Sequence, residues 1–153
     1  MKAILIATAA LIGGAAQAKT IASLEQFGGF CAEKCPTTTI SIDDNGTVSV
    51  ERKKTTPPSV ETYNLANLNV SKVVAAIQKD IETVAPADEF VDVNPNAPMC
   101  MDIPEIHYYA IKGDAKIEIG VDRNCKQYRP STFEGSGIVD TLRSLLTIDN
   151  YAR

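Results

Sequence analysis

The segment that most constrains the fold is Thr37–Val50, whose pattern is typical of a β-hairpin. Two runs rich in β-branched residues flank the sequence Asp-Asp-Asn-Gly at 43–46. Asn and Gly tolerate the positive φ angles that tight hairpin turns require. The apolar residues expected on one face of this hairpin are Ile40, Ile42, Val48 and Val50. The chain is therefore expected to build an antiparallel sheet with an apolar face.

Five other segments carry a helical or strand pattern. Val70–Val84 has apolar residues at the i, i+3, i+4, i+7 spacing of an amphipathic helix, and Ile138–Leu146 predicts a final helix in the same way. Ile106–Ile111 and Lys116–Val121 flank a Lys-Gly-Asp-Ala turn and predict a second hairpin. Thr20–Phe27 has apolar residues three apart, which predicts a short helix ended by two glycines.

Val60–Leu65 predicts one more strand, and Phe90-Val91 a short extended piece within a proline-rich loop. The order hairpin then helix occurs twice along the chain. The sequence therefore predicts an α+β fold, with an antiparallel sheet of four to five strands and two main helices packed on one face.

The first eighteen residues predict export from the cytoplasm. An apolar run follows the basic Lys2 and ends in Ala-Gln-Ala at 16–18, which is typical of a secretory signal peptide. The run is shorter than the roughly 20 residues that span a bilayer, and Lys19 follows the expected cut in place of a lipid-modified cysteine. We therefore expect a signal peptide at 1–18 and a single periplasmic or secreted domain at 19–153, without a stable membrane anchor.

Export determines how the four cysteines are interpreted, because exported chains usually oxidise them. Three pairings are possible. If 113–114 forms the turn of the second hairpin, Cys100 and Cys125 lie near its open end on opposite arms. We predict the disulfide Cys100–Cys125, which leaves Cys31–Cys35 as the second one.

The run Cys31-Ala-Glu-Lys-Cys35-Pro36 suggests an alternative. It resembles the CxxxCP copper and thiol motif of the Sco-type assembly proteins, which pair the motif with a distant histidine. That resemblance implies a copper(I) or thiol-redox site formed by Cys31, Cys35 and the sole histidine, His107. In that family the motif lies in a thioredoxin-like fold and a helix follows it, whereas a β-hairpin is expected here. Structural disulfides without a metal or cofactor are our first prediction, and copper(I) binding is the alternative.

A hydrolase is the second alternative, and it has no complete motif. Ser136 lacks the glycine two positions before it that a nucleophile elbow requires, and a helix cap accounts for it better. Any histidine-dependent mechanism must use His107. Because the chain has no tryptophan, a sugar-stacking platform would have to come from tyrosines. The candidates are Tyr63, Tyr108, Tyr109 and Tyr128. We expect no catalytic residue.

The layout from Cys35 onward also resembles a known group of proteins. Cys35-Pro36 runs directly into a hairpin, Asp102 precedes the second hairpin, and a helix ends the chain. This arrangement is similar to an uncharacterised family of bacterial exported and lipoprotein domains, over Phe30–Leu146. The resemblance implies the α+β layout and no activity.

Charge and loop composition indicate the kind of partner. The formal net charge is −4 with scattered lysines and arginines, whereas nucleic-acid binding needs clustered ones.

The loop Ala85–Pro104 contains four prolines and is expected to be held in place by Cys100. Loops held on a rigid scaffold commonly carry recognition. We therefore predict an exported binding or accessory protein, such as an inhibitor or scavenger, that contacts an envelope or extracellular protein through this loop.

Overall fold

The structure is a computed structural model that describes residues 18–28, 37–53, 59–64, 70–101, 103–132 and 136–151. The predicted leader up to residue 17, the CxxxCP motif with Cys31 and Cys35, and Asp102 lie outside the described residues. The expected Cys31–Cys35 disulfide and the copper site therefore stay predictions.

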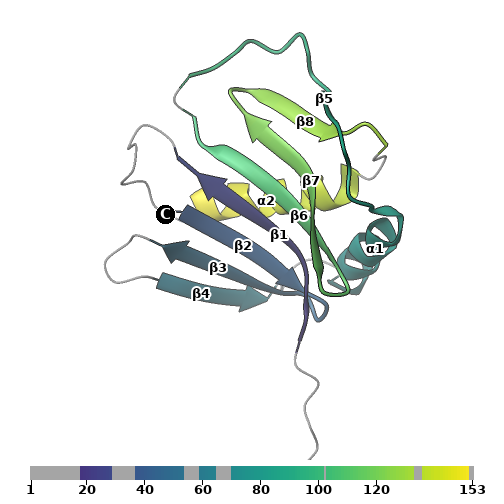
Figure 1. The fold of residues 1–153 in the computed structure, drawn as a ribbon. Helices are drawn as coiled ribbons and strands as arrows, with labels where there is room; N and C mark the ends of the chain where they lie inside the picture. The colour runs from purple at the N-terminus through teal and green to yellow at the C-terminus, as the bar shows by residue number, and fades with distance from the viewer. Residues whose placement is uncertain are drawn as a thin grey trace, which may run out of the picture.

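An eight-stranded antiparallel sheet makes up most of the described chain (Figure 1). From one edge to the other, its strands are β4 (Ser59–Asn64), β3 (Thr47–Lys53), β2 (Thr37–Asp43), β1 (Thr20–Phe27), β6 (Glu105–Lys112), β7 (Ala115–Arg123), β8 (Lys126–Pro130) and β5 (Phe90–Asp92). Each neighbouring pair is antiparallel.

Two helices, α1 (Val70–Thr83) and α2 (Ser136–Tyr151), contact each other and the central strands β1 and β6. In the view of Figure 1, α2 passes behind the strands and α1 lies beside the turn end of β6 and β7. The core between helices and sheet contains fully buried residues from both layers. Its largest members include Tyr108, Leu24, Ile40, Ile42, Ile77, Ile138, Leu142 and Leu145. None of the described helices covers the other side of the sheet, which we call the open face.

The predicted fold, an α+β arrangement with four to five strands and two main helices packed on one face, is wrong. The helices are short, and the sheet has eight strands among the described residues. Part of the error lies at β1, which was predicted to be a helix. Leu24 on β1 pairs with Ile40 on one side and Tyr108 on the other, and all three are fully buried. Apolar spacing over eight residues cannot distinguish a short helix from a central strand that pairs with a neighbouring strand on each side.

The first predicted hairpin is confirmed by the β2–β3 pairing, in which Ile40 faces Val50 and Ile42 faces Val48. Its turn has a positive φ only at Gly46, where φ is +82°. A Cβ at that position would lie 2.0 Å from Cγ1 of Val70, the first residue of α1. The glycine therefore serves both the turn and the close approach of the helix to the sheet.

The second predicted hairpin is confirmed by the β6–β7 pairing, which starts at Lys112 and Ala115 around the 113–114 turn. A register shift next to Tyr108 and Tyr109 marks a β-bulge in this pair. The strand β8, which was not predicted, extends the sheet beyond β7.

Candidate functional site

The predicted disulfide between Cys100 and Cys125 is present, with the two Cα atoms 5.3 Å apart. Cys125 lies in the tight turn between β7 and β8, where Asn124 and Cys125 both have a positive φ, 52° and 62°. Two consecutive left-handed residues are typical of a two-residue hairpin turn. The backbone N–H of Cys100 also donates to the carbonyl of Asn124 over 3.0 Å. The disulfide therefore fastens the loop before β6 to this turn.

The segment 93–101, which we call the strap, is held at further points along its length. The Val93 N–H donates to the Gln127 carbonyl over 2.8 Å. The largely buried ammonium group of Lys126 lies 3.3 Å from Oδ2 of Asp92 and donates to the Pro95 carbonyl over 2.6 Å. Figure 1 shows this segment arching beyond the sheet between β5 and β6. The strap is thus attached to β8 and to the β7–β8 turn at several separate points.

The strap nevertheless exposes apolar side chains. Val93, Met99 and Met101 have 52%, 73% and 82% of their surface exposed. The two methionines flank Cys100, whose sulfur is fixed by the disulfide. The anchored backbone therefore displays apolar groups that the described part of the fold does not cover.

The open face contains a second cluster, centred on His107. The Nδ1 atom of His107 lies 2.5 Å from Oε1 of Glu118, and its Nε2 atom lies 3.1 Å from Oε1 of Glu105. The ring also packs edge-on against Phe27, with 5.5 Å between ring centroids. A neutral imidazole carries one N–H, so both contacts are hydrogen bonds only when His107 is protonated. The group is then an ion triad with two carboxylates and one cation.

Tyr109 stands beside this triad, with its ring stacked on that of His107 at 6.3 Å between centroids. The Lys116 ammonium lies 3.9 Å from the Tyr109 ring centroid and 2.5 Å from a carboxylate oxygen of Glu25. Burial raises the pKa of Tyr109 to about 12, and the nearby charges of Glu25 and Glu118 add to the effect. Burial, reinforced by the two nearby carboxylates, therefore favours the neutral phenol.

We expect Tyr109 to ionise near pH 12, about two pH units above an ordinary tyrosine. Between pH 10 and 12 the unfolded chain loses this proton while the folded chain keeps it, so the contribution of Tyr109 to stability falls as the pH rises. An absorbance titration of phenolate formation measures the pKa. In Tyr109→Phe the step near pH 12 should disappear. A Tyr109 that titrates with the exposed tyrosines would contradict the prediction.

A hollow of about 310 Å³ lies next to the triad on the open face. Its lining residues are Phe90, Glu105, His107, Glu118, Val121, Arg123 and Tyr128. The Arg123 guanidinium lies over the Tyr128 ring, 4.7 Å from its centroid. Within the described residues Arg123 has no carboxylate partner, whereas Arg52, Arg129 and Arg143 each have at least one. The hollow thus combines aromatic walls, two carboxylates and an uncompensated guanidinium.

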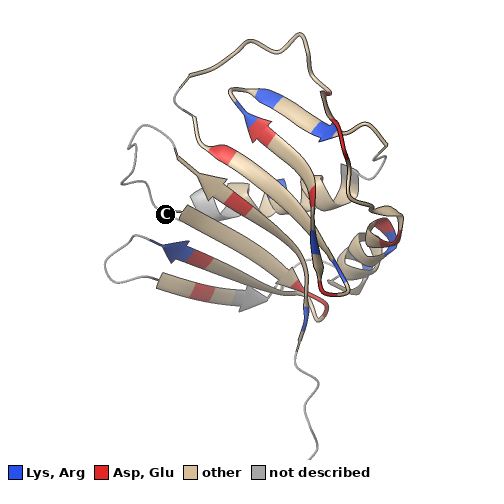
Figure 2. Ribbon diagram, viewed as in Figure 1, with Lys and Arg blue, Asp and Glu red and all other residues tan. Residues whose placement is uncertain are grey.

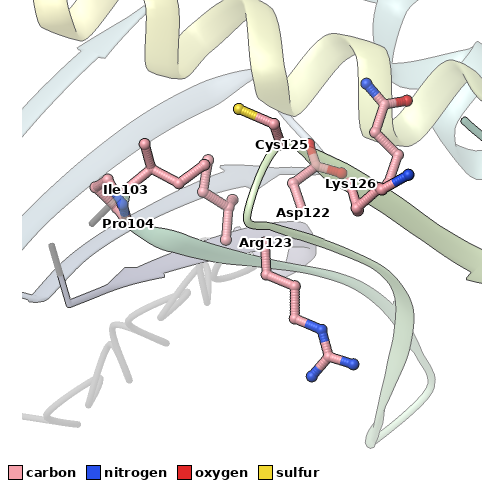
Figure 3. Close-up of a pocket in the computed structure, with 8 residues that line it drawn as sticks. Ile103, Pro104, Asp122, Arg123, Cys125 and Lys126 are labelled. Atoms are coloured by element: carbon pink, nitrogen blue, oxygen red, sulfur yellow. The ribbon is translucent and has the colours of Figure 1, made fainter. Parts of the chain in front are cut away.

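The neighbouring residue Asp122 lies on the helix side of the sheet. Figure 3 shows Asp122 extending toward the helix ribbon and Arg123 extending away from it. Asp122 accepts hydrogen bonds from Arg129 at 2.9 Å, Arg143 at 2.9 Å and the Tyr108 hydroxyl at 2.8 Å. Burial raises the pKa of Tyr108 far above its usual value, and Asp122 raises it further. The smaller hollow in Figure 3, about 130 Å³, lies beside this network. Because Asp122 is already shared by three donors, we assign the network a structural role.

The predicted site residues are placed as follows. His107 lies on the open face between two carboxylates, and Cys100 and Cys125 form the disulfide. Ser136 is the first residue of α2. Of the tyrosines proposed as a sugar platform, Tyr108 is buried, whereas Tyr109 and Tyr128 lie on the open face. Among the described side chains, no group of three or more His, Cys, Asp or Glu is arranged to hold a metal ion.

Sequence reasoning missed Glu105, Glu118 and Arg123 as members of a site. Glu105 lies one residue before the predicted strand Ile106–Ile111 and two before His107. Had the strand been extended by one residue, this spacing would have placed both side chains on one face. Glu118 and Arg123 come from the next strand, and their proximity to His107 depends on the β6–β7 register and its bulge.

A scan against protein-family models found no match, and searches of curated proteins and of solved structures found no significant match. The resemblance to exported and lipoprotein domains therefore stays a prediction.

Proposed function

We propose that this chain is an exported binding protein that contacts an envelope or extracellular protein through the strap. The observation that carries the proposal is an apolar segment that is firmly anchored and still exposed. The signal-peptide pattern and the disulfide support a periplasmic or secreted location. No described helix is long and apolar enough to cross a membrane.

Anchoring favours recognition because a fixed loop loses little conformational entropy when it binds. Methionine is enriched at protein interfaces, and its flexible thioether adapts to irregular partner surfaces. Figure 2 shows lysines and arginines interspersed with acidic residues on the face in view, which supports a protein partner over nucleic acid.

The test places a photoreactive amino acid at Met99 and, in a matched protein, at Val60. Val60 is 67% exposed but lies on β4, at the opposite edge of the sheet from β5. After illumination with an envelope extract, position 99 should give one dominant adduct that position 60 does not. Adding Met101→Ser should weaken that adduct. The same adducts from both positions, or none from position 99, would refute binding through the strap.

A further inference from the structure

We propose that the open-face hollow binds a small zwitterion, specifically a free α-amino acid with an apolar or aromatic side chain. In this arrangement Arg123 holds the carboxylate, Glu105 and Glu118 hold the ammonium group, and Phe90, Val121 and Tyr128 contact the side chain. This site is separate from the strap, and it does not depend on the proposed partner.

The position of Arg123 is the first argument. Its guanidinium lies over the Tyr128 ring, 4.7 Å from the ring centroid, and its N–H groups have no carboxylate partner among the described residues. A planar guanidinium with free N–H groups matches a carboxylate in a two-pronged hydrogen bond. Arg123 is therefore placed to receive the carboxylate of a ligand in the hollow.

The position of Glu105 is the second argument. In the β6–β7 register Ile106 faces Asp122, so the next pair along places Glu105 beside Arg123. These two residues line the same hollow, yet no ion pair joins them. Glu105 contacts His107, and Arg123 contacts Tyr128. An anionic and a cationic group thus lie on adjacent strands without pairing with each other, and both line the space that a ligand would occupy.

The charge balance of the hollow is the third argument. Two carboxylates face a single imidazole, so the triad keeps at least one negative charge even when His107 is protonated, and Arg123 adds one positive charge elsewhere in the hollow. The two carboxylates would repel a purely anionic ligand, and Arg123 would repel a purely cationic one. A ligand with one charge of each sign avoids both repulsions.

Size and wall composition define the ligand further. A volume of about 310 Å³ lies at the small end of ligand pockets, which suits a single amino acid better than a longer peptide. Phe90, Val121 and the Tyr128 ring provide apolar surface next to the charged groups. The hollow therefore favours phenylalanine or leucine over a polar amino acid.

The experiment measures binding to the full mature chain by titration calorimetry at millimolar concentrations. The probes are L-phenylalanine, N-acetyl-L-phenylalanine, which lacks the positive charge, and L-phenylalanine amide, which lacks the negative charge. We expect saturable binding of L-phenylalanine. Each blocked form should bind with an affinity at least roughly tenfold lower, because it loses a charged hydrogen bond. Equal binding of either blocked form, binding of a neutral sugar only, or no saturable binding would overturn the proposal.

Variants identify the site. Arg123→Gln should abolish the preference for L-phenylalanine over its amide. Glu105→Gln should reduce the preference for L-phenylalanine over the N-acetyl form, because Glu118 still contacts the ammonium group. Arg123→Lys keeps the positive charge but cannot form the two-pronged hydrogen bond, so this variant should bind L-phenylalanine with intermediate affinity. Lys79→Gln, on an exposed position of α1, is the matched control and should leave binding unchanged. Binding that survives both Arg123→Gln and Glu105→Gln would place the ligand elsewhere and refute the proposal. Met101→Ser should leave amino-acid binding intact, so this site and the strap succeed or fail separately.

Discussion

Asp122→Ala is expected to lower the free energy of unfolding by about 3 kcal/mol, because it leaves several partly buried donors without their acceptor. Asp122 receives the side chains of Arg129 and Arg143 and the hydroxyl of Tyr108. Arg129 retains only 12% of its side-chain exposure, and Tyr108 is fully buried. Urea unfolding, followed by circular dichroism, measures the loss.

Asp114→Ala is the matched control for this prediction. Asp114 lies in the β6–β7 turn with a fully exposed side chain, and its ion pair with Lys19 spans 3.5 Å in solvent. Exposed pairs of this kind contribute little, so no measurable change is expected. The loss of unfolding free energy in Asp122→Asn should lie between the losses in these two variants, because asparagine still accepts a hydrogen bond but carries no charge. If Asp122→Ala unfolded at the same urea concentration as Asp114→Ala, the network would have no structural role.

Removal of the Cys100–Cys125 disulfide is expected to cost about 3 kcal/mol in the chain-entropy model, because the bond closes a loop of 25 residues in the unfolded chain. The double variant Cys100→Ser/Cys125→Ser should unfold at a lower urea concentration. It should also be cleaved faster within 93–101, since the main attachment of the strap is gone.

Lys126→Met provides the comparison for the disulfide. It removes the polar contacts of Lys126 with Asp92, Asn94 and Pro95 while keeping the disulfide, so the strap should stay protected from proteolysis. Unchanged cleavage in the double cysteine variant would show that the disulfide does not hold the strap, and the proposed recognition surface would lose its support.

Local patterns predicted the elements whose structure depends on nearby residues. The helix predicted at 70–84 is confirmed as Val70–Thr83, because its apolar stripe spans several turns. Both hairpins are confirmed, because their turns and alternation lie within one short stretch. The Cys100–Cys125 disulfide is also confirmed. The second hairpin brings the segments that carry the two cysteines to its open end, and contacts of the strap with β8 and the β7–β8 turn complete the approach.

Long-range pairing explains what sequence reasoning missed. The expected helix at Thr20–Phe27 is a central strand, because β2 and β6 both pair with it. His107 was singled out as the sole histidine, whereas its contact with Glu118 comes from the neighbouring strand. The shared carboxylate of Asp122 likewise joins β7 to α2 through Arg143.

The amino-acid pattern by itself determined the two hairpins and the helix Val70–Thr83, since neighbours along the chain set these elements. It also predicted the pairing of Cys100 with Cys125, because the second hairpin brings their segments to its open end. The tertiary structure alone decided that Thr20–Phe27 is a strand and that the sheet has eight strands within the described residues. It also decided that four side chains line one hollow, namely Glu105, His107, Glu118 and Arg123. The physical reason is that strand pairing gains its free energy between segments far apart in sequence. Local propensity carries no information about which of them will meet.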